Sequence, residues 1–274
     1  MSLTCFTKLL KPWSVEQLIA FAKETGLAGY DLTVRDGYAV TPDRIERDLG
    51  PYVKRLKDAS LSVPLVTFGV RAYKADEPIV ERAWAACAEA GVPAVKLGYW
   101  TWSPQGPHYW DQVKTIRKEL AGYAKLAARF GVQALFHNHS DPYYGLNASA
   151  LMHLIQDLDP AHVGAYVDPA HLALDGEPLG MAIDILRGRI AMVAVKNSFY
   201  QREQKDGKVR WNRGMCGLQE GLVDWPEAVQ LFRAAGYAGP FNLHAEYDDR
   251  HEVEQVVEAL RVDIKLMRRA TGEV

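Results

Sequence analysis

Eight short runs rich in β-branched and aromatic residues alternate along this 274-residue chain with longer stretches whose apolar residues recur at helical spacing. Such alternation is typical of successive βα units, whose parallel strands are buried on both faces. A doubly wound open sheet could give the same pattern. The count of eight, the chain length and the absence of a Gly-rich phosphate-binding sequence after the first run favour a single-domain (β/α)8 TIM barrel over residues 1–274. The predicted strands lie near Leu3 to Thr7, Gly29 to Val34, Ser62 to Phe68, Ala94 to Gly98, Gln133 to His137, Val163 to Asp168, Ile190 to Lys196 and Phe241 to Glu246.

The predicted helices have recognisable first and last residues. A capping-box pattern starts at Ser14, and Asn147 and Asp224 precede apolar helical periodicity as N-caps. Glycines able to close a helix in the left-handed conformation follow four helical stretches, at Gly26, Gly91, Gly131 and Gly236.

Composition excludes several classes of protein. Hydrophobic residues make up 48% of the chain and charged residues 24%, which is ordinary for a folded globular domain. The 32 basic and 34 acidic residues give a net charge of −2, so no positive excess is available for a nucleic-acid backbone. Three scattered cysteines suit neither a disulfide framework nor a zinc site and favour a reducing compartment.

The beginning of the chain shows no signal-peptide pattern, and no run approaches the roughly 20 apolar residues of a membrane-spanning helix. We therefore expect a cytoplasmic protein without a membrane partner.

Four of the apolar runs end in groups that can bind a metal or move a proton. In a (β/α)8 barrel the carboxyl ends of the strands meet at one face, where active sites are built. The pattern therefore predicts an enzyme whose site is built from His137-Asn138-His139-Ser140-Asp141, Asp168-Pro169-Ala170-His171, Lys196-Asn197 and His244-Ala245-Glu246.

Residues two apart on a strand share a face, which pairs His137 with His139, Ala194 with Lys196, and His244 with Glu246. Donors that converge from separate segments can hold a metal, and His137, Asp168 and Glu246 meet that requirement. Each histidine could instead be simply hydrogen-bonded within the structure.

Asp168 could cap the turn that follows it. Lys196 could hold a substrate oxygen or pair with Asp168 or Glu246 in the barrel mouth.

Two long segments should emerge at the same face of the barrel. The segment after the fourth strand carries Trp100 and Trp102, whose rings could stack on a sugar or form a lid or subunit contact. A homo-oligomer is therefore possible. The segment from Asn197 to Gly221 contains Trp211 and Arg213 and could equally be a mobile surface loop.

The chain resembles the xylose isomerase-like TIM barrels, the superfamily of sugar isomerases and epimerases that also includes endonuclease IV. The resemblance extends over essentially the whole length. Its most specific pieces are residues 131–139, 163–171, 221–225 and 236–246.

The resemblance implies a divalent metal held by Glu, Asp, His and Glu from the last four strands, with the two glutamates also moving protons. Carried over by position, the aspartate is Asp168 and the final glutamate is Glu246. His137 replaces the first glutamate, and Ala194 stands where the histidine is expected. The ion would be Mn²⁺ or Mg²⁺, or Zn²⁺. The trinuclear zinc site of the endonuclease branch needs more ligands than this chain offers.

Residues and resemblance together predict a sugar or keto-sugar isomerase or epimerase that abstracts a proton next to a carbonyl. Glu246 would be ligand and acid/base, His137 ligand and base, and Lys196 the oxygen anchor. The remaining histidines and an amide would support the site or bind substrate: His139, His171, His244 and Asn197. A dehydratase or lyase on the same barrel and a non-catalytic carbohydrate-binding barrel are the alternatives.

Overall fold

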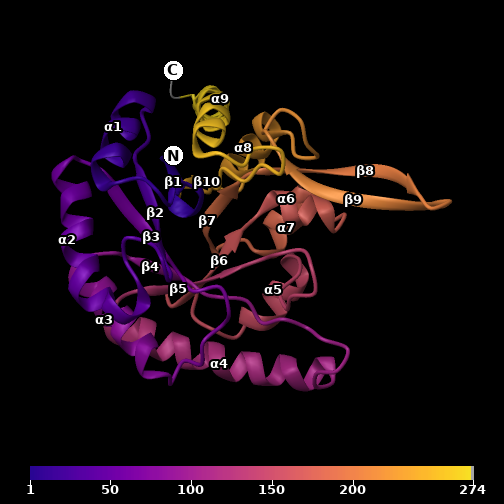
Figure 1. The fold of residues 1–274 in the computed structure, drawn as a ribbon. Coiled ribbons are helices and arrows are strands. Elements are labelled where there is room, and N and C mark those ends of the chain that lie inside the picture. The colour runs from indigo at the N-terminus through magenta and orange to yellow at the C-terminus, as the bar shows by residue number, and fades with distance from the viewer. Residues whose placement is uncertain (273–274) are drawn as a thin grey trace.

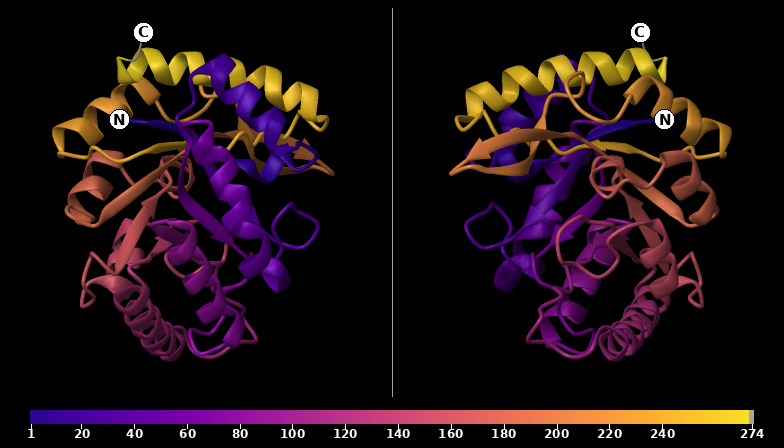
Figure 2. Two further views of the ribbon diagram at one scale, coloured as in Figure 1. Left: turned by 90° about the vertical axis from the view of Figure 1, so that its left-hand side faces the viewer. Right: turned by 90° about the vertical axis from the view of Figure 1, so that its right-hand side faces the viewer.

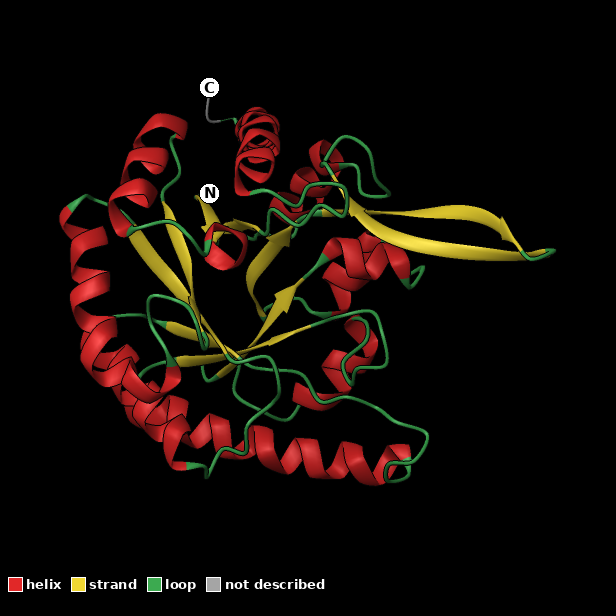
Figure 3. Cartoon of the chain, viewed as in Figure 1, coloured by secondary structure: helices red, strands yellow, loops and turns green. Residues whose placement is uncertain are grey.

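The computed structural model describes residues 1–272 as a closed barrel of eight parallel strands in the order β1-β10-β7-β6-β5-β4-β3-β2 (Figure 1). The helices surround this barrel (Figure 3). The prediction of a (β/α)8 barrel is confirmed, and all eight predicted strands form. In the described part of the chain, no helix combines the length and apolar character needed to cross a membrane.

The barrel strands are β1 (Leu3–Phe6), β2 (Gly29–Val34), β3 (Ser62–Phe68), β4 (Ala94–Lys96), β5 (Gln133–His137), β6 (Val163–Val167), β7 (Ile190–Val195) and β10 (Phe241–Leu243). The α-helices are α1 (Val15–Thr25), α2 (Ile45–Asp58), α3 (Pro78–Ala90), α4 (Tyr109–Phe130), α5 (Ala148–Ile155), α6 (Pro169–Leu174), α7 (Leu179–Ile185), α8 (Trp225–Ala234) and α9 (Val253–Thr271). Two 3₁₀ turns, η1 (Thr7–Leu10) and η2 (Pro42–Arg44), follow the first two strands.

The predicted helix caps form. Ser14 and Gln17 make a reciprocal capping box before α1, and the side chains of Asn147 and Asp224 accept hydrogen bonds from the first turns of α5 and α8. Helices α1, α3 and α4 close on left-handed glycines, with φ between 64° and 77°. These local signals determine where these helices begin and end. They therefore also limit where the neighbouring strands end.

Two hydrophobic clusters hold the barrel together. The larger one joins the outward faces of the strands to the surrounding helices. The smaller one comes from five successive strands, β3 to β7, and fills the barrel interior below the site. Its buried members are Leu65, Ala94, Leu135, Tyr166, Met192 and Ala194.

The segment that the sequence left open as a mobile surface loop contains an antiparallel hairpin. Its strands, β8 (Asn197–Lys205) and β9 (Lys208–Cys216), pair along their whole length and project away from the barrel (Figures 1 and 2). The turn is Asp206-Gly207, and both residues have positive φ, 52° and 71°. Asp-Gly is well suited to such a two-residue hairpin turn.

Candidate active site

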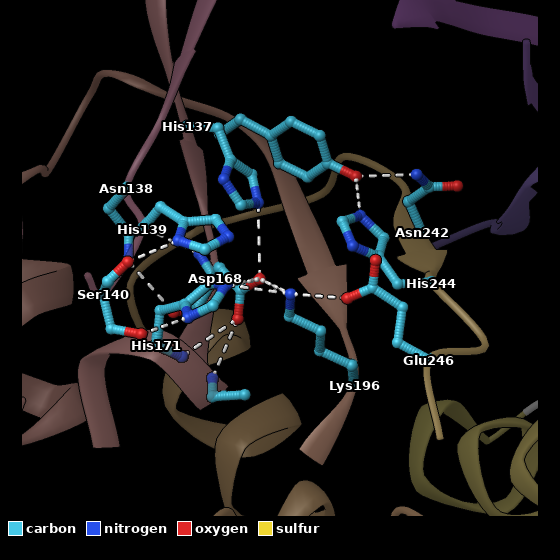
Figure 4. A network of polar contacts seen from close by, with 12 residues as sticks. His137, Asn138, His139, Ser140, Asp168, His171, Lys196, Asn242, His244 and Glu246 are labelled. Carbon is cyan, nitrogen blue, oxygen red and sulfur yellow. Dashed lines mark hydrogen bonds and ion pairs between the residues drawn. The ribbon is translucent and has the colours of Figure 1, made fainter. Parts of the chain in front are cut away.

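The carboxyl ends of β5, β6, β7 and β10 bring the predicted polar groups together at one end of the barrel (Figure 4). On the first three of these strands, the site residue follows an interior residue of the small hydrophobic cluster by two positions, so it also faces inward. The pairs are Leu135 and His137, Tyr166 and Asp168, and Ala194 and Lys196.

Strand β10 ends at Leu243, earlier than predicted, because Ala245 adopts a left-handed conformation with φ of 52°. Such a conformation is uncommon outside glycine. The bend separates His244 from Glu246. The first is buried and bonded to Tyr166 at 2.7 Å, and the second reaches the cavity at the barrel mouth.

Asp168 lies at the centre of the site and is fully buried. Its Oδ1 accepts hydrogen bonds from the backbone N–H groups of Ala170 and His171, which confirms the predicted cap. Asn138 holds its backbone from the neighbouring strand, accepting from its N–H at 2.7 Å and donating to its carbonyl at 3.1 Å. Asp168 Oδ2 is thereby left to face the other site residues.

His137, Asp168 and His244 are placed so that one nitrogen or oxygen of each lies within 4.8 Å of the others. His137 Nε2 is 3.3 Å from Asp168 Oδ2. Among the described residues, His137 Nε2 has no hydrogen-bond partner, whereas Asp168 Oδ2 has an ion pair with Lys196 Nζ at 3.2 Å. Unpartnered buried polar atoms are costly unless a further group satisfies them. Two imidazoles and one carboxylate are donor types that a divalent transition-metal ion accepts, but the Lys196 ammonium, 3.2 Å from Asp168 Oδ2, opposes such an ion at this position.

Lys196 is the cation of this site. Its Nζ lies 3.2 Å from Asp168 Oδ2 and 2.9 Å from Glu246 Oε2, so the pairing expected with one or the other carboxylate forms with both. Burial alone would lower the pKa of Lys196, but the two carboxylates outweigh burial and hold that pKa above its ordinary value. The side chain is therefore an ammonium group at neutral pH.

Glu246 is held between two ammonium groups. Lys8 of η1 contacts its Oε1 at 2.6 Å, and Lys196 contacts its Oε2. Burial opposes ionisation, yet Lys196 and Lys8 keep the pKa of Glu246 well below its ordinary range. Lys8 was not singled out in the sequence, because it follows the first strand and meets Glu246 only through closure of the barrel.

His171 and His139 have defined proton positions. The Lys196 ammonium can only donate, so His171 Nε2 accepts its hydrogen bond at 2.9 Å, and His171 Nδ1 donates to Ser140 Oγ at 2.8 Å. His139 Nδ1 donates to the Ser140 carbonyl, which leaves Nε2 as its basic nitrogen.

All four histidines of the site are neutral at pH 7. Burial, reinforced by nearby ammonium groups, holds the pKa of His137 and His171 well below the ordinary value. The same causes lower the pKa of His139 to about 4 and that of His244 to about 3.

A buried polar network that the sequence did not reveal supports His244 from below. Tyr166 hydroxyl accepts from Asn242 Nδ2 at 2.7 Å and donates to His244 Nε2 at 2.7 Å. The same Asn242 amide also donates to Asp31 Oδ2 at 3.1 Å. Because His244 Nε2 accepts the hydrogen bond from Tyr166, the neutral His244 ring carries its proton on Nδ1, and Nδ1 would have to lose that proton before it could bind a metal.

A cavity of about 590 Å³ opens above these residues. This size lies within the range of small-molecule sites, roughly 300–1,000 Å³. The base of the hairpin forms one wall through Arg213, which pairs with Asp141. Six residues of the predicted site segments line the cavity: His139, Ser140, Asp141, His171, Lys196 and Glu246.

Other predicted residues lie elsewhere. Trp100 stacks on Phe136 with ring centroids 5.5 Å apart, and Trp102 is exposed; neither lines the cavity. Asn197 is buried, and its amide donates to the carbonyls of Leu218 and Val223, so it anchors the chain after the hairpin. His137 and His244 lie beneath the cavity.

The family model described as the xylose isomerase-like TIM barrel matches residues 19–269. The chain belongs to this family. None of the curated sequences compared with the chain matches it.

Solved structures agree on the fold. The 3-keto-D-glucoside 4-epimerase of E. coli is 16% identical, with 97% of this chain and 99% of that one covered and a TM-score of 0.72. A D-psicose 3-epimerase crystallised with D-fructose is 13% identical, with 99% and 100% covered and a TM-score of 0.74. A probable 3-DHS dehydratase of Bacillus anthracis is 13% identical, with 97% and 98% covered and a TM-score of 0.72. At these identities the likeness concerns the fold alone.

Proposed function

We propose that this chain is a keto-sugar isomerase or epimerase that removes a proton from a carbon next to a carbonyl. One observation carries the proposal: the Lys196 ammonium and the Glu246 carboxylate line the same cavity, 2.9 Å apart. An acidic hydrogen-bond donor beside a base is what enolisation of a carbonyl compound requires.

In this reaction Lys196 donates a hydrogen bond to the substrate carbonyl oxygen and stabilises the negative charge that develops there. The ammonium then shares its charge between this oxygen and Glu246. Because Lys196 is one of the two groups that hold the pKa of Glu246 low, its turn toward the substrate makes Glu246 a stronger base. Glu246 takes the proton from the adjacent carbon.

His139 is the second proton-transfer group of the cavity. Burial and the charge of Lys196 lower its pKa to about 4, so its imidazole is neutral and its Nε2 can accept a proton. Because Nε2 carries no proton, we assign to His139 the relay of a proton between neighbouring oxygens, while Glu246, protonated in the first step, returns its proton to carbon. His137 does not line the cavity, so we propose that it holds Asp168 and the metal position and is not the base.

The proposed steps need no divalent ion, because the Lys196 ammonium stabilises the charge on the carbonyl oxygen. An ion that did bind at His137, Asp168 and His244 would supply a Lewis acid. The two imidazoles favour Mn²⁺ or Zn²⁺ over Mg²⁺, which prefers oxygen ligands.

The comparisons support the substrate class. Two of the similar structures are named as epimerases, one of a 3-keto-D-glucoside and one of D-psicose. We therefore propose a free keto-sugar or a keto-glycoside as substrate. The shared fold, the family and the position of the cavity at the carboxyl ends of the strands agree with this.

A dehydratase is the second candidate, because one structure of equal similarity is named as a probable dehydratase. An enolate with a hydroxyl on the next carbon can expel that hydroxyl, and Glu246, protonated in the first step, can supply the proton with which the hydroxyl leaves as water. Product mass separates the two: an unchanged mass indicates an isomerase, and loss of water indicates a dehydratase.

The test compares the wild-type protein, Glu246→Gln and the surface control Glu258→Gln on α9 against a panel of ketoses and 3-keto-glycosides. We expect Glu246→Gln to lower turnover by at least about 1,000-fold, because the base is lost. Glu258→Gln should behave as wild type. A fully active Glu246→Gln protein would contradict the assignment, and sugar binding without turnover by the wild type would favour the non-catalytic alternative.

A further inference from the structure

The Lys196 ammonium lies among the groups whose negative charge a divalent ion would balance. It contacts three groups at once: Asp168 Oδ2 at 3.2 Å, Glu246 Oε2 at 2.9 Å and His171 Nε2 at 2.9 Å (Figure 4). The side chain is buried, with a relative exposure of 3%. A buried ammonium with this set of partners already supplies positive charge to both carboxylates.

The metal position and the ammonium use the same oxygen. Asp168 Oδ2 is the atom that faces His137 Nε2 at 3.3 Å, and it is also the atom that Lys196 contacts. Oδ1 cannot substitute, because it caps α6 through two backbone N–H groups. A divalent ion bound at Oδ2 would therefore lie beside a buried positive charge, and at such separations the repulsion is large in a poorly solvated site.

Glu246 is not available as an additional ligand. Its Oε2 is bonded to Lys196 and its Oε1 to Lys8, at 2.9 and 2.6 Å. A metal ion would have to displace an ammonium to reach either oxygen. Ala194 lies on β7 two residues before Lys196 and also faces inward. The family resemblance leads one to expect a histidine there, but alanine offers no metal ligand.

We propose that Lys196 is the resident cation of this site and excludes divalent metal from the His137, Asp168 and His244 position. The protein then binds a divalent ion weakly as it stands and tightly only when Lys196 is replaced by a neutral residue. The proposal rests on the proposed function in assigning this cavity as the active site, but its consequence is measured as metal affinity.

The experiment titrates Mn²⁺ alone into chelator-treated protein and follows free Mn²⁺ by electron paramagnetic resonance. Lys196→Met keeps an unbranched side chain, one atom shorter than lysine, and removes its charge. Lys8→Met is the matched control, because it removes the other ammonium from Glu246 and leaves Asp168 Oδ2 untouched. We expect Lys196→Met to lower the Kd for Mn²⁺ by about 100-fold or more and Lys8→Met to change it by no more than about threefold.

A second replacement tests whether the gain in Mn²⁺ affinity depends on the proposed ligands. Adding His137→Ala to Lys196→Met should restore weak binding, because it removes one of the three donors. Circular dichroism checks the fold. If Lys196→Met unfolds without metal, the proposal expects Mn²⁺ to restore its helical signal, and Lys196→Gln provides a second neutral variant for the titration.

The proposal is overturned if wild type and Lys196→Met bind Mn²⁺ equally, if Lys8→Met shows the same gain, or if the gain survives His137→Ala. Failure of the proposed function gives a different result. A protein without turnover on any keto-sugar, but with the expected gain in Lys196→Met, retains the metal exclusion and loses only the enzymatic assignment.

Discussion

Mild acid should destabilise this protein strongly, because four buried site histidines are neutral in the folded state. Each has a pKa below the ordinary value of 6.5, owing first to burial. Between that value and their folded values the unfolded chain binds more protons than the folded one, so stability is full above about pH 6.5 and falls as the pH decreases. The histidines are His137, His139, His171 and His244.

The magnitude follows from the linkage relation. An unfolded histidine that gains its proton between pH 7 and pH 5, while the folded one does not, costs about 2 kcal/mol. Four such groups cost roughly 8 kcal/mol. Burial raises the pKa of Asp31 to about 7 and that of Asp263 to about 6, so these carboxyl groups bind protons in the folded state over the same range and offset roughly 4 kcal/mol of this loss. The remaining loss is a large part of the roughly 5–15 kcal/mol that typically stabilises a folded protein. We expect the free energy of unfolding from urea denaturation, followed by tryptophan fluorescence, to fall by several kcal/mol from pH 7 to pH 5.

His139→Gln should reduce this pH-dependent loss by about 2 kcal/mol, because one proton-binding group is removed. Tyr30→Phe is the control. The Tyr30 hydroxyl donates to the Leu18 carbonyl at 2.6 Å, and burial raises its pKa far above the working pH. Its replacement should cost about 1 kcal/mol at both pH values. A flat stability between pH 7 and pH 5, or an unchanged pH dependence in His139→Gln, would refute the reasoning.

Three further outcomes are expected. Tyr166→Phe should lower the free energy of unfolding by about 2–4 kcal/mol, more than Tyr30→Phe, because it leaves two buried polar partners unsatisfied; urea denaturation measures it. Asn197→Ala should lower it by about 2–3 kcal/mol and speed proteolytic cleavage within residues 217–223, which its amide anchors. Replacing residues 201–212 of the exposed hairpin by Asn-Gly should shift the Tm by less than about 3 °C in a thermal melt.

The barrel could be predicted because its signals are local. Strands β2, β4 and β5 each follow a helix-closing glycine, and Ser14, Asn147 and Asp224 cap helices where expected. The period of two along β5 and β7 also placed His137 and Lys196 on the inward face. These features depend on a few neighbouring residues and so survive in the sequence.

The hairpin of β8 and β9 was missed although its turn has a signature. Asp206-Gly207 is a favoured hairpin dipeptide, but the flanking residues are mostly polar and exposed, so no alternation of apolar residues marked the strands. The physical reason is that neither face of the outer hairpin packs on the core of this chain.

The contacts that define the site were the hardest to foresee. Lys8 meets Glu246 across the closure of the barrel, and Tyr166 joins Asn242 to His244 between strands that are far apart in sequence. The left-handed turn at Ala245 breaks the period of two that seemed to pair His244 with Glu246. Such contacts depend on the three-dimensional register of the strands.

The central claim, that Glu246 moves a proton next to a carbonyl held by Lys196, is tested most directly by solvent exchange. Keto-sugars are incubated with the protein in D₂O, and deuterium incorporation at the carbon beside the carbonyl is followed by NMR. We predict incorporation into at least one keto-sugar with the wild-type protein and none above background with Glu246→Gln. Equal incorporation by both proteins, or none by the wild type with any keto-sugar tested, would contradict the claim.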